Sequence, residues 1–268
     1  MKLNKFAAVL AASSMLASGS AIASPFFINV DGFDTPLATT DGYTGTMDEI
    51  QINVLATSTY TDLDANGVDI GDSVIDNGAG TVGGFLLNGT NLLGDEDLEG
   101  LNTSIYSLRV EYKDLSGTVS AVDATDPTNV GIGAIYNSGT LRVFADTDLD
   151  KDSDLEILTL SVFASTGTIA NALIFANVTF ALDNTWFFPP MTDWTDVTVG
   201  IKMTYDTNVY GPAPAAIAPN AEGQARFART STLNGSATFN TVPEPSALAL
   251  LGIGLIGLGA ARRFKKVS

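Results

Sequence analysis

The chain has 268 residues, neither cysteine nor histidine, and a formal net charge of −17. A sequence without cysteine excludes disulfides and thiol nucleophiles, and one without histidine excludes histidine-dependent catalysis and histidine-ligated metals. The acidic excess argues against a nucleic-acid partner, because phosphates would be repelled. Carboxylate chemistry and calcium bound through oxygen ligands remain open.

Residues 1–23 have the pattern of a secretory signal peptide. Lys2 and Lys5 precede an apolar stretch, and a zone of small residues follows and ends in Ala21-Ile22-Ala23. Two alanines at this spacing are typical of a signal-peptidase site, so we predict cleavage between Ala23 and Ser24. The remainder of the protein is therefore expected to be exported.

The last segment, residues 243–268, combines a stiff motif, a short apolar run and a basic end. Pro243-Glu244-Pro245 is held extended, since each proline fixes its own φ angle and restricts the residue before it. The apolar run 247–261 would span about 22 Å as a helix, which is short for a hydrocarbon core of about 30 Å. We predict a transmembrane helix that holds the protein only transiently. Its basic end should stay cytoplasmic and comprises Arg262, Arg263, Lys265 and Lys266.

The order of these three parts resembles the PEP-CTERM sorting signal. The resemblance implies that an exosortase, a membrane enzyme, recognises the tail and cuts near Pro243, Glu244 and Pro245. It also implies an exported protein of a Gram-negative bacterium, tethered briefly at the inner membrane and then found at the cell surface or in the extracellular polysaccharide matrix. Ser24-Pro25-Phe26 and the stretch 62–78, together with the tail, are similar to flocculation-associated PEP-CTERM proteins.

Between the two signals, residues 24–242 are predicted to form one all-β domain, an antiparallel sandwich or jelly roll. Segments 106–112 and 197–205 alternate apolar and polar residues, which is typical of antiparallel strands with one buried face. Asn88-Gly89 and Asn234-Gly235 are typical of two-residue hairpin turns. Further strands are predicted near 48–60, 118–123, 131–136, 140–145, 155–163, 171–182, 225–232 and 236–241.

Two acidic segments are candidate Ca²⁺ sites. The first begins like a calcium-binding loop, with acids at alternate positions before a glycine, but its twelfth position is Ser73 rather than an acid. Its candidate ligands are Asp62, Asp64, Asn66, Asp69 and Asp72. The second segment places acids at every second position, and a cation would relieve their repulsion. Its candidate ligands are Asp146, Asp148, Asp150, Asp152 and Asp154. Solvated acidic turns are the alternative for both segments.

Both tryptophans of the chain, Trp186 and Trp194, lie in one aromatic segment. They could stack on sugar rings or close one end of the β-core, and burial is the more usual fate of large aromatics.

These features predict an exported, exosortase-processed surface or matrix protein that is not an enzyme. Its expected role is in exopolysaccharide-associated biofilm or floc formation, with extracellular polysaccharide as a partner. One alternative is a calcium-dependent carbohydrate-binding or adhesin module. A second alternative is a polysaccharide hydrolase that uses a pair of carboxylates, although no motif singles out such a pair.

Overall fold

The computed structural model describes the β-strands of the predicted domain and the loops that join most of them. It covers residues 25–30, 44–92, 101, 107–146, 154–169, 171–182, 186–187, 198–204, 210–238 and 240–241. Residues Ala23–Asn240 form one compact unit. The predicted signal peptide and the tail from 243 onward lie outside the described residues. No helix within the described ranges is long and apolar enough to cross a membrane.

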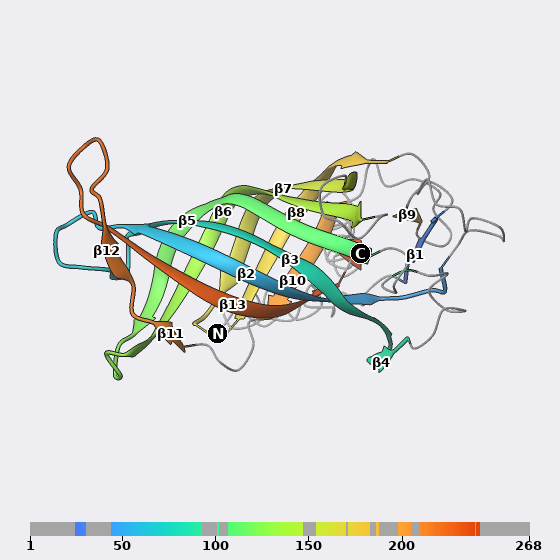
Figure 1. Cartoon of the computed structure of the whole chain (residues 1–268), viewed down its shortest axis with the longest axis horizontal. Coiled ribbons are helices and arrows are strands. Elements are labelled where there is room, and N and C mark those ends of the chain that lie inside the picture. Colours follow the sequence, from blue (N-terminus) through green and yellow to red (C-terminus); the bar gives the residue numbers. More distant parts are fainter. Residues whose placement is uncertain are drawn as a thin grey trace, which may run out of the picture. The chain divides into compact units, whose positions relative to one another are not determined.

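All regular structure in these ranges is β-strand, which confirms the all-β prediction. The long strands form most of the structure, and the short strands lie at its ends (Figure 1). The strands are β1 (Phe27–Ile28), β2 (Glu49–Thr61), β3 (Ser73–Leu87), β4 (Thr90–Asn91), β5 (Ser107–Asp123), β6 (Asn129–Asp146), β7 (Leu155–Gly167), β8 (Asn171–Ala181), β9 (Trp186–Phe187), β10 (Thr198–Thr204), β11 (Tyr210–Pro212), β12 (Ala215–Ile217), β13 (Arg226–Thr238) and β14 (Asn240–Thr241).

One large antiparallel sheet contains most of these strands. Its order runs β12-β13-β2-β3-β5-β6-β7-β8-β10-β14, so neighbours in the sequence are usually neighbours in space. The main exception is β13, which returns from the end of the domain to pair with β2 along its whole length. The sheet curves far enough that β10 also contacts β13. Short strand β11 pairs with β6 and contacts β13, and β1 pairs separately with β9.

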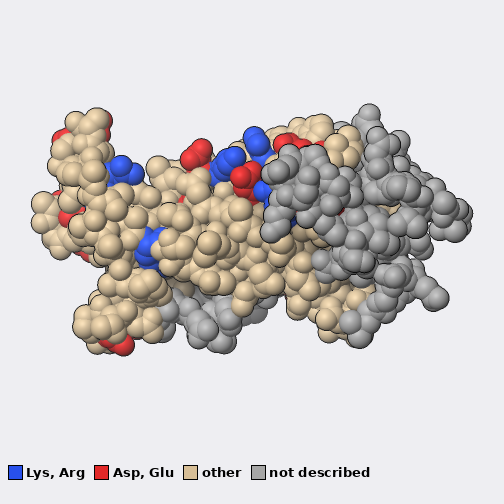
Figure 2. Space-filling model, viewed as in Figure 1, with Lys and Arg blue, Asp and Glu red and all other residues tan. Residues whose placement is uncertain are grey.

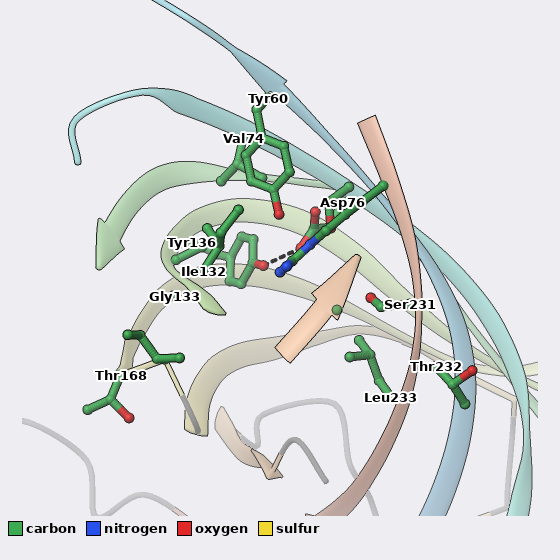
Figure 3. Close-up of a pocket in the computed structure, with 15 residues that line it drawn as sticks. Tyr60, Val74, Asp76, Ile132, Gly133, Tyr136, Thr168, Ser231, Thr232 and Leu233 are labelled. Carbon is green, nitrogen blue, oxygen red and sulfur yellow. Dashed lines mark hydrogen bonds between the residues drawn. The ribbon is translucent and has the colours of Figure 1, made fainter. Parts of the chain in front are cut away.

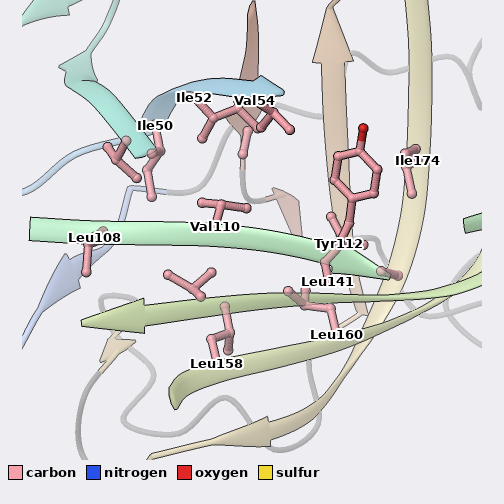
Figure 4. Close-up of a cluster of buried hydrophobic side chains, with 14 of the residues drawn as sticks. Ile50, Ile52, Val54, Leu108, Val110, Tyr112, Leu141, Leu158, Leu160 and Ile174 are labelled. Carbon is pink, nitrogen blue, oxygen red and sulfur yellow. The ribbon is translucent and has the colours of Figure 1, made fainter. Parts of the chain in front are cut away.

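Among the described residues, the concave face of the sheet encloses one hydrophobic core. Along β2, burial alternates strictly, so that Ile50, Ile52 and Val54 point inward while the residues between them are exposed. The same period of two recurs in β5 at Leu108, Val110 and Tyr112, and these side chains meet those of β2, β6 and β7 in one cluster (Figure 4). Burial of this apolar face is the main force that holds the strands together.

The boundaries of several predicted strands require correction. Residues 107–112 and 118–123 belong to the single strand β5, and 131–136 and 140–145 belong to β6. Each of these strands continues through an irregularity in the β5–β6 pairing, at which Asp114 and Gly139 take positive φ angles.

Of the two predicted hairpin turns, the first is confirmed and the second is wrong. Asn88 and Gly89 both have positive φ angles and connect β3 to β4, as a two-residue hairpin requires. Asn234-Gly235 instead lies inside β13, where both residues pair with β2. The partner strand β2 is long enough to pair with all 13 residues of β13, so pairing along its length overrides the local turn signal.

Candidate functional site

The acidic loop 62–72, which joins β2 to β3, is organised around the carboxylate of Asp62. Its Oδ1 accepts hydrogen bonds from the backbone N–H groups of Asp64, Ala65 and Asn66, and its Oδ2 accepts one from Gly67. Gly67 has a φ angle of +103°, which glycine adopts without strain. These donors lower the pKa of Asp62 below its ordinary value of 3.8, with the Gly67 N–H as the largest contributor.

Asp72 closes the same loop from the other side. Its Oδ1 accepts a hydrogen bond from the backbone of Leu63, and its Oδ2 accepts one from Asp69. Two backbone bonds with Val119 tie the loop to β5, one from Gly71 N–H at 3.0 Å and one to the Asp72 carbonyl at 2.8 Å. The loop is therefore fixed at both ends and anchored to the sheet.

Three of the five predicted ligands of this loop come together. Carboxylate oxygens of Asp62, Asp64 and Asp72 all lie within 4.8 Å of one another. Among the described residues, these three form the group of acidic side chains that is close enough to hold a metal ion. Partial desolvation raises the pKa of Asp64, and repulsion from Asp69 and its other acidic neighbours adds to the shift. The Asn66 side-chain amide donates to both Asp64 and Asp69 at 2.9 Å, so all five residues form one connected network.

The second acidic segment is only partly described. Asp146 is buried at the end of β6, and Asp154 forms an ion pair with Arg109. Asp148, Asp150 and Asp152 lie outside the described residues. The structure thus assigns Asp154 a partner of opposite charge on β5.

The predicted aromatic platform is described only at Trp186, where the backbone pairs with Ile28. Trp194 lies outside the described residues.

Figure 2 shows basic side chains beside acidic ones over a mostly uncharged surface. The described ion pairs include Lys113 with Glu111 at 3.2 Å and Arg142 with Glu156 at 3.9 Å.

A buried polar row crosses β13, β2 and β3, and it was not among the predicted sites. Arg229 is in register with Ser58, and Ser58 is in register with Asp76. All three positions belong to the inward-facing set of their strands, where neighbouring rows hold apolar residues such as Ala56 and Val74. The row therefore places a carboxylate and a guanidinium at positions that otherwise build the core.

Tyr136 of β6 completes this group by donating a hydrogen bond from its hydroxyl to Asp76 Oδ2 (Figure 3). Burial raises the pKa of Asp76, while the hydroxyls of Tyr136 and Ser58 and the charge of Arg229 act in the opposite direction. Burial likewise raises the pKa of Tyr60 above 10.0. Tyr60 therefore stays protonated at neutral pH.

The row borders a cavity of about 40 Å³ that is partly open to its surroundings. Tyr60, Asp76 and Tyr136 point into it from three strands, as Figure 3 shows, and Gly211 of β11 lines it with Arg229. Arg229 lies over the Tyr60 ring, with 5.8 Å between the guanidinium carbon and the ring centroid. Its Nη1 donates to the Val130 carbonyl at 2.9 Å.

A sequence signal for this group does exist. Ser58 and Tyr60 continue the inward period of β2, and Asp76 falls two residues after Val74 on β3. A carboxylate at an inward position indicates a special environment. The signal was missed because the stretch 73–87 was not predicted to be a strand at all.

A comparison with protein-family models identifies residues 241–263 as a PEP-CTERM protein-sorting motif. The chain carries a PEP-CTERM sorting signal. This motif implies an exported protein that is targeted to an exosortase and processed at the membrane. The predicted resemblance is thus confirmed for the tail, while the similarity to flocculation-associated proteins is not. Searches of curated proteins and of solved structures found no match.

Proposed function

We propose that this is a non-enzymatic surface or matrix protein of a Gram-negative bacterium that contributes to exopolysaccharide-associated biofilm or floc formation. The sorting motif at 241–263 carries the proposal, because it assigns the protein to an exosortase pathway. The β-domain supports it by its build, since one hydrophobic core joins buried side chains of β2, β3, β5, β6, β7 and β8. A rigid β-domain released outside the cell suits a structural role.

The processing step is tested by mass spectrometry of the protein recovered from outside the cells. We expect a C-terminus near Pro243, Glu244 or Pro245 in the producing strain and an uncut, membrane-bound chain in a strain without exosortase. An extracellular form that retains Arg262–Lys266 would contradict the proposal. The matrix role is tested separately by deleting the gene and measuring cell aggregation and the protein bound to the polysaccharide fraction. Unchanged aggregation would refute that part.

A second candidate function is Ca²⁺ binding by the loop 62–72. The supporting observation is the close approach of Asp62, Asp64 and Asp72, because oxygen ligands that converge on one point are what Ca²⁺ requires. The bound ion would stiffen the loop between β2 and β3 and make an adhesin role calcium-dependent. Calorimetry with CaCl₂ tests this reading, with Asp64→Asn as the variant. An absence of heat at millimolar Ca²⁺, together with an unchanged melting temperature, would refute it.

A further inference from the structure

We propose that the cavity between β2, β3, β6 and β13 binds hydroxyl groups of a neutral sugar. The inference rests on the proposed matrix role for the source of the sugar, a carbohydrate of the surrounding polymer. It concerns a different part of the molecule from the acidic loop and needs no calcium.

Two unpartnered polar atoms carry the proposal. Asp76 Oδ1 and Arg229 Nε are buried, and neither has a hydrogen-bond partner within the described part of the chain. Asp76 as a whole is only 6% exposed, and it lines the same cavity as Arg229. Buried polar atoms are almost always satisfied by protein, water or ligand. A hydrogen-bond acceptor and a donor are therefore left for an occupant of this cavity.

The chemistry of these two groups favours a neutral hydroxylated occupant. The carboxylate of Asp76 repels an anion, and the guanidinium of Arg229 repels a cation. A hydroxyl group both donates and accepts hydrogen bonds, so a sugar hydroxyl suits both partners. Ser58, Ser231 and Thr232 add hydroxyls to the lining, and the Tyr60 ring supplies an apolar wall of the kind that sugars contact.

The size of the cavity limits what enters. A volume of about 40 Å³ is room for about three water-sized groups. That is enough for a pair of neighbouring hydroxyls or a hydroxymethyl group, with the rest of the sugar ring outside. Arg229 is fixed by its bond to Val130 and its place over Tyr60, so the site is formed before a ligand arrives.

The test uses the processed protein recovered from outside the cells and a panel of methyl glycosides of glucose, galactose and mannose at neutral pH. Glycine serves as a zwitterionic competitor, and calorimetry and saturation-transfer NMR measure binding. We expect millimolar affinity for at least one glycoside, unaffected by EDTA. Asp76→Asn should weaken binding by about tenfold or more, because the acceptor charge is lost. Asp114→Asn is the matched control, since it makes the same change on an exposed part of β5.

A second variant keeps the test decisive if Asp76→Asn does not fold. A Cβ added at Gly211 would lie 3.6 Å from Arg229 Nη1 and 3.8 Å from Ser231 Cβ. Gly211→Ala therefore fits without a clash while narrowing the cavity, and it should also weaken binding by about tenfold. Any of three outcomes would overturn the inference. No glycoside binds, only glycine binds, or Gly211→Ala leaves glycoside binding unchanged. A processed, matrix-bound protein that binds no glycoside would refute this inference and leave the proposed function standing.

Discussion

Two adjacent residues of β2 offer a sharp test of which face of the sheet is buried. Val54 is 2% exposed and belongs to the hydrophobic core, whereas Leu55 is 61% exposed on the outer face. Truncating each residue to alanine should therefore change the free energy of unfolding by very different amounts. Val54→Ala should lower the free energy of unfolding clearly, and Leu55→Ala should barely change it, although leucine loses more atoms.

The magnitudes follow from burial. Val54→Ala removes two buried methyl groups, each worth about 0.8 kcal/mol of transfer free energy, and the cavity left behind adds a further cost. The expected loss is about 2–3 kcal/mol. Leu55→Ala removes side-chain atoms that are mostly in water already, so its effect should stay within about 0.5 kcal/mol.

Urea unfolding of the full chain, followed by circular dichroism, measures both variants against the parent protein. Their m-values should match, because the same surface is exposed on unfolding. Equal losses for the two variants, or a larger loss for Leu55→Ala, would refute the reasoning. A shift of β2 by one residue exchanges its two faces, so that result would mean that the strand register is wrong.

Three further predictions concern the backbone and the carboxylates. Gly80→Ala should destabilise by about 3 kcal/mol or more, because its Cβ would lie 1.8 Å from the Asn53 carbonyl oxygen. Gly84→Ala should cost about 1 kcal/mol or less, since its Cβ meets only the ends of two side chains, Asn91 Oδ1 at 3.1 Å and Gln51 Oε1 at 3.3 Å. Similar melting temperatures for the two variants would contradict this. Asp76→Asn should gain stability relative to the parent protein as pH rises. Because the folded pKa of Asp76 is raised, protonated Asp76 stabilises the parent fully below pH 3.8, and this stabilisation is lost as pH rises through the folded pKa. A stability difference that stays constant between pH 3 and 8 would show that the pKa of Asp76 is not perturbed. Asp62→Asn should destabilise at neutral pH and progressively less as pH falls below 3.8 through the lowered pKa, and Gly67 amide exchange would report the loss of its hydrogen bond.

The strands that the sequence predicts well are those with an unbroken period of two. Residues 107–112 of the predicted segment 106–112 fall within β5, where Leu108, Val110 and Tyr112 alternate with polar residues without interruption. Strand β3 was missed because it carries Gly78, Gly80, Gly83 and Gly84, and glycine-rich segments are typical of loops. The structure shows why they are there: a side chain at Gly80 would collide with the backbone of β2. That requirement arises between strands, so local pattern does not reveal it.

The two candidate sites also differ in whether the sequence alone reveals them. The acidic loop is visible in the sequence because Asp62, Asp64 and Asp72 are close together in the chain. The buried row is not, because Asp76, Tyr136 and Arg229 are far apart in the chain and meet only when β3, β6 and β13 take their places in the sheet. Pairing of β13 with β2 is what brings Arg229 to Ser58.

The position of β13 has a consequence for the order of folding. The strands from β2 to β8 pair with neighbours in the sequence, so they can assemble one after another as the chain emerges. β13 pairs with β2 from the opposite end of the domain, so it closes the longest loop and joins last. It ends at Thr238, and the sorting motif begins at residue 241. Strand β14 (Asn240–Thr241), which neighbours β10 in the sheet, lies between β13 and most of that motif, so tension on the segment on which exosortase acts would reach β14 first and β13 next.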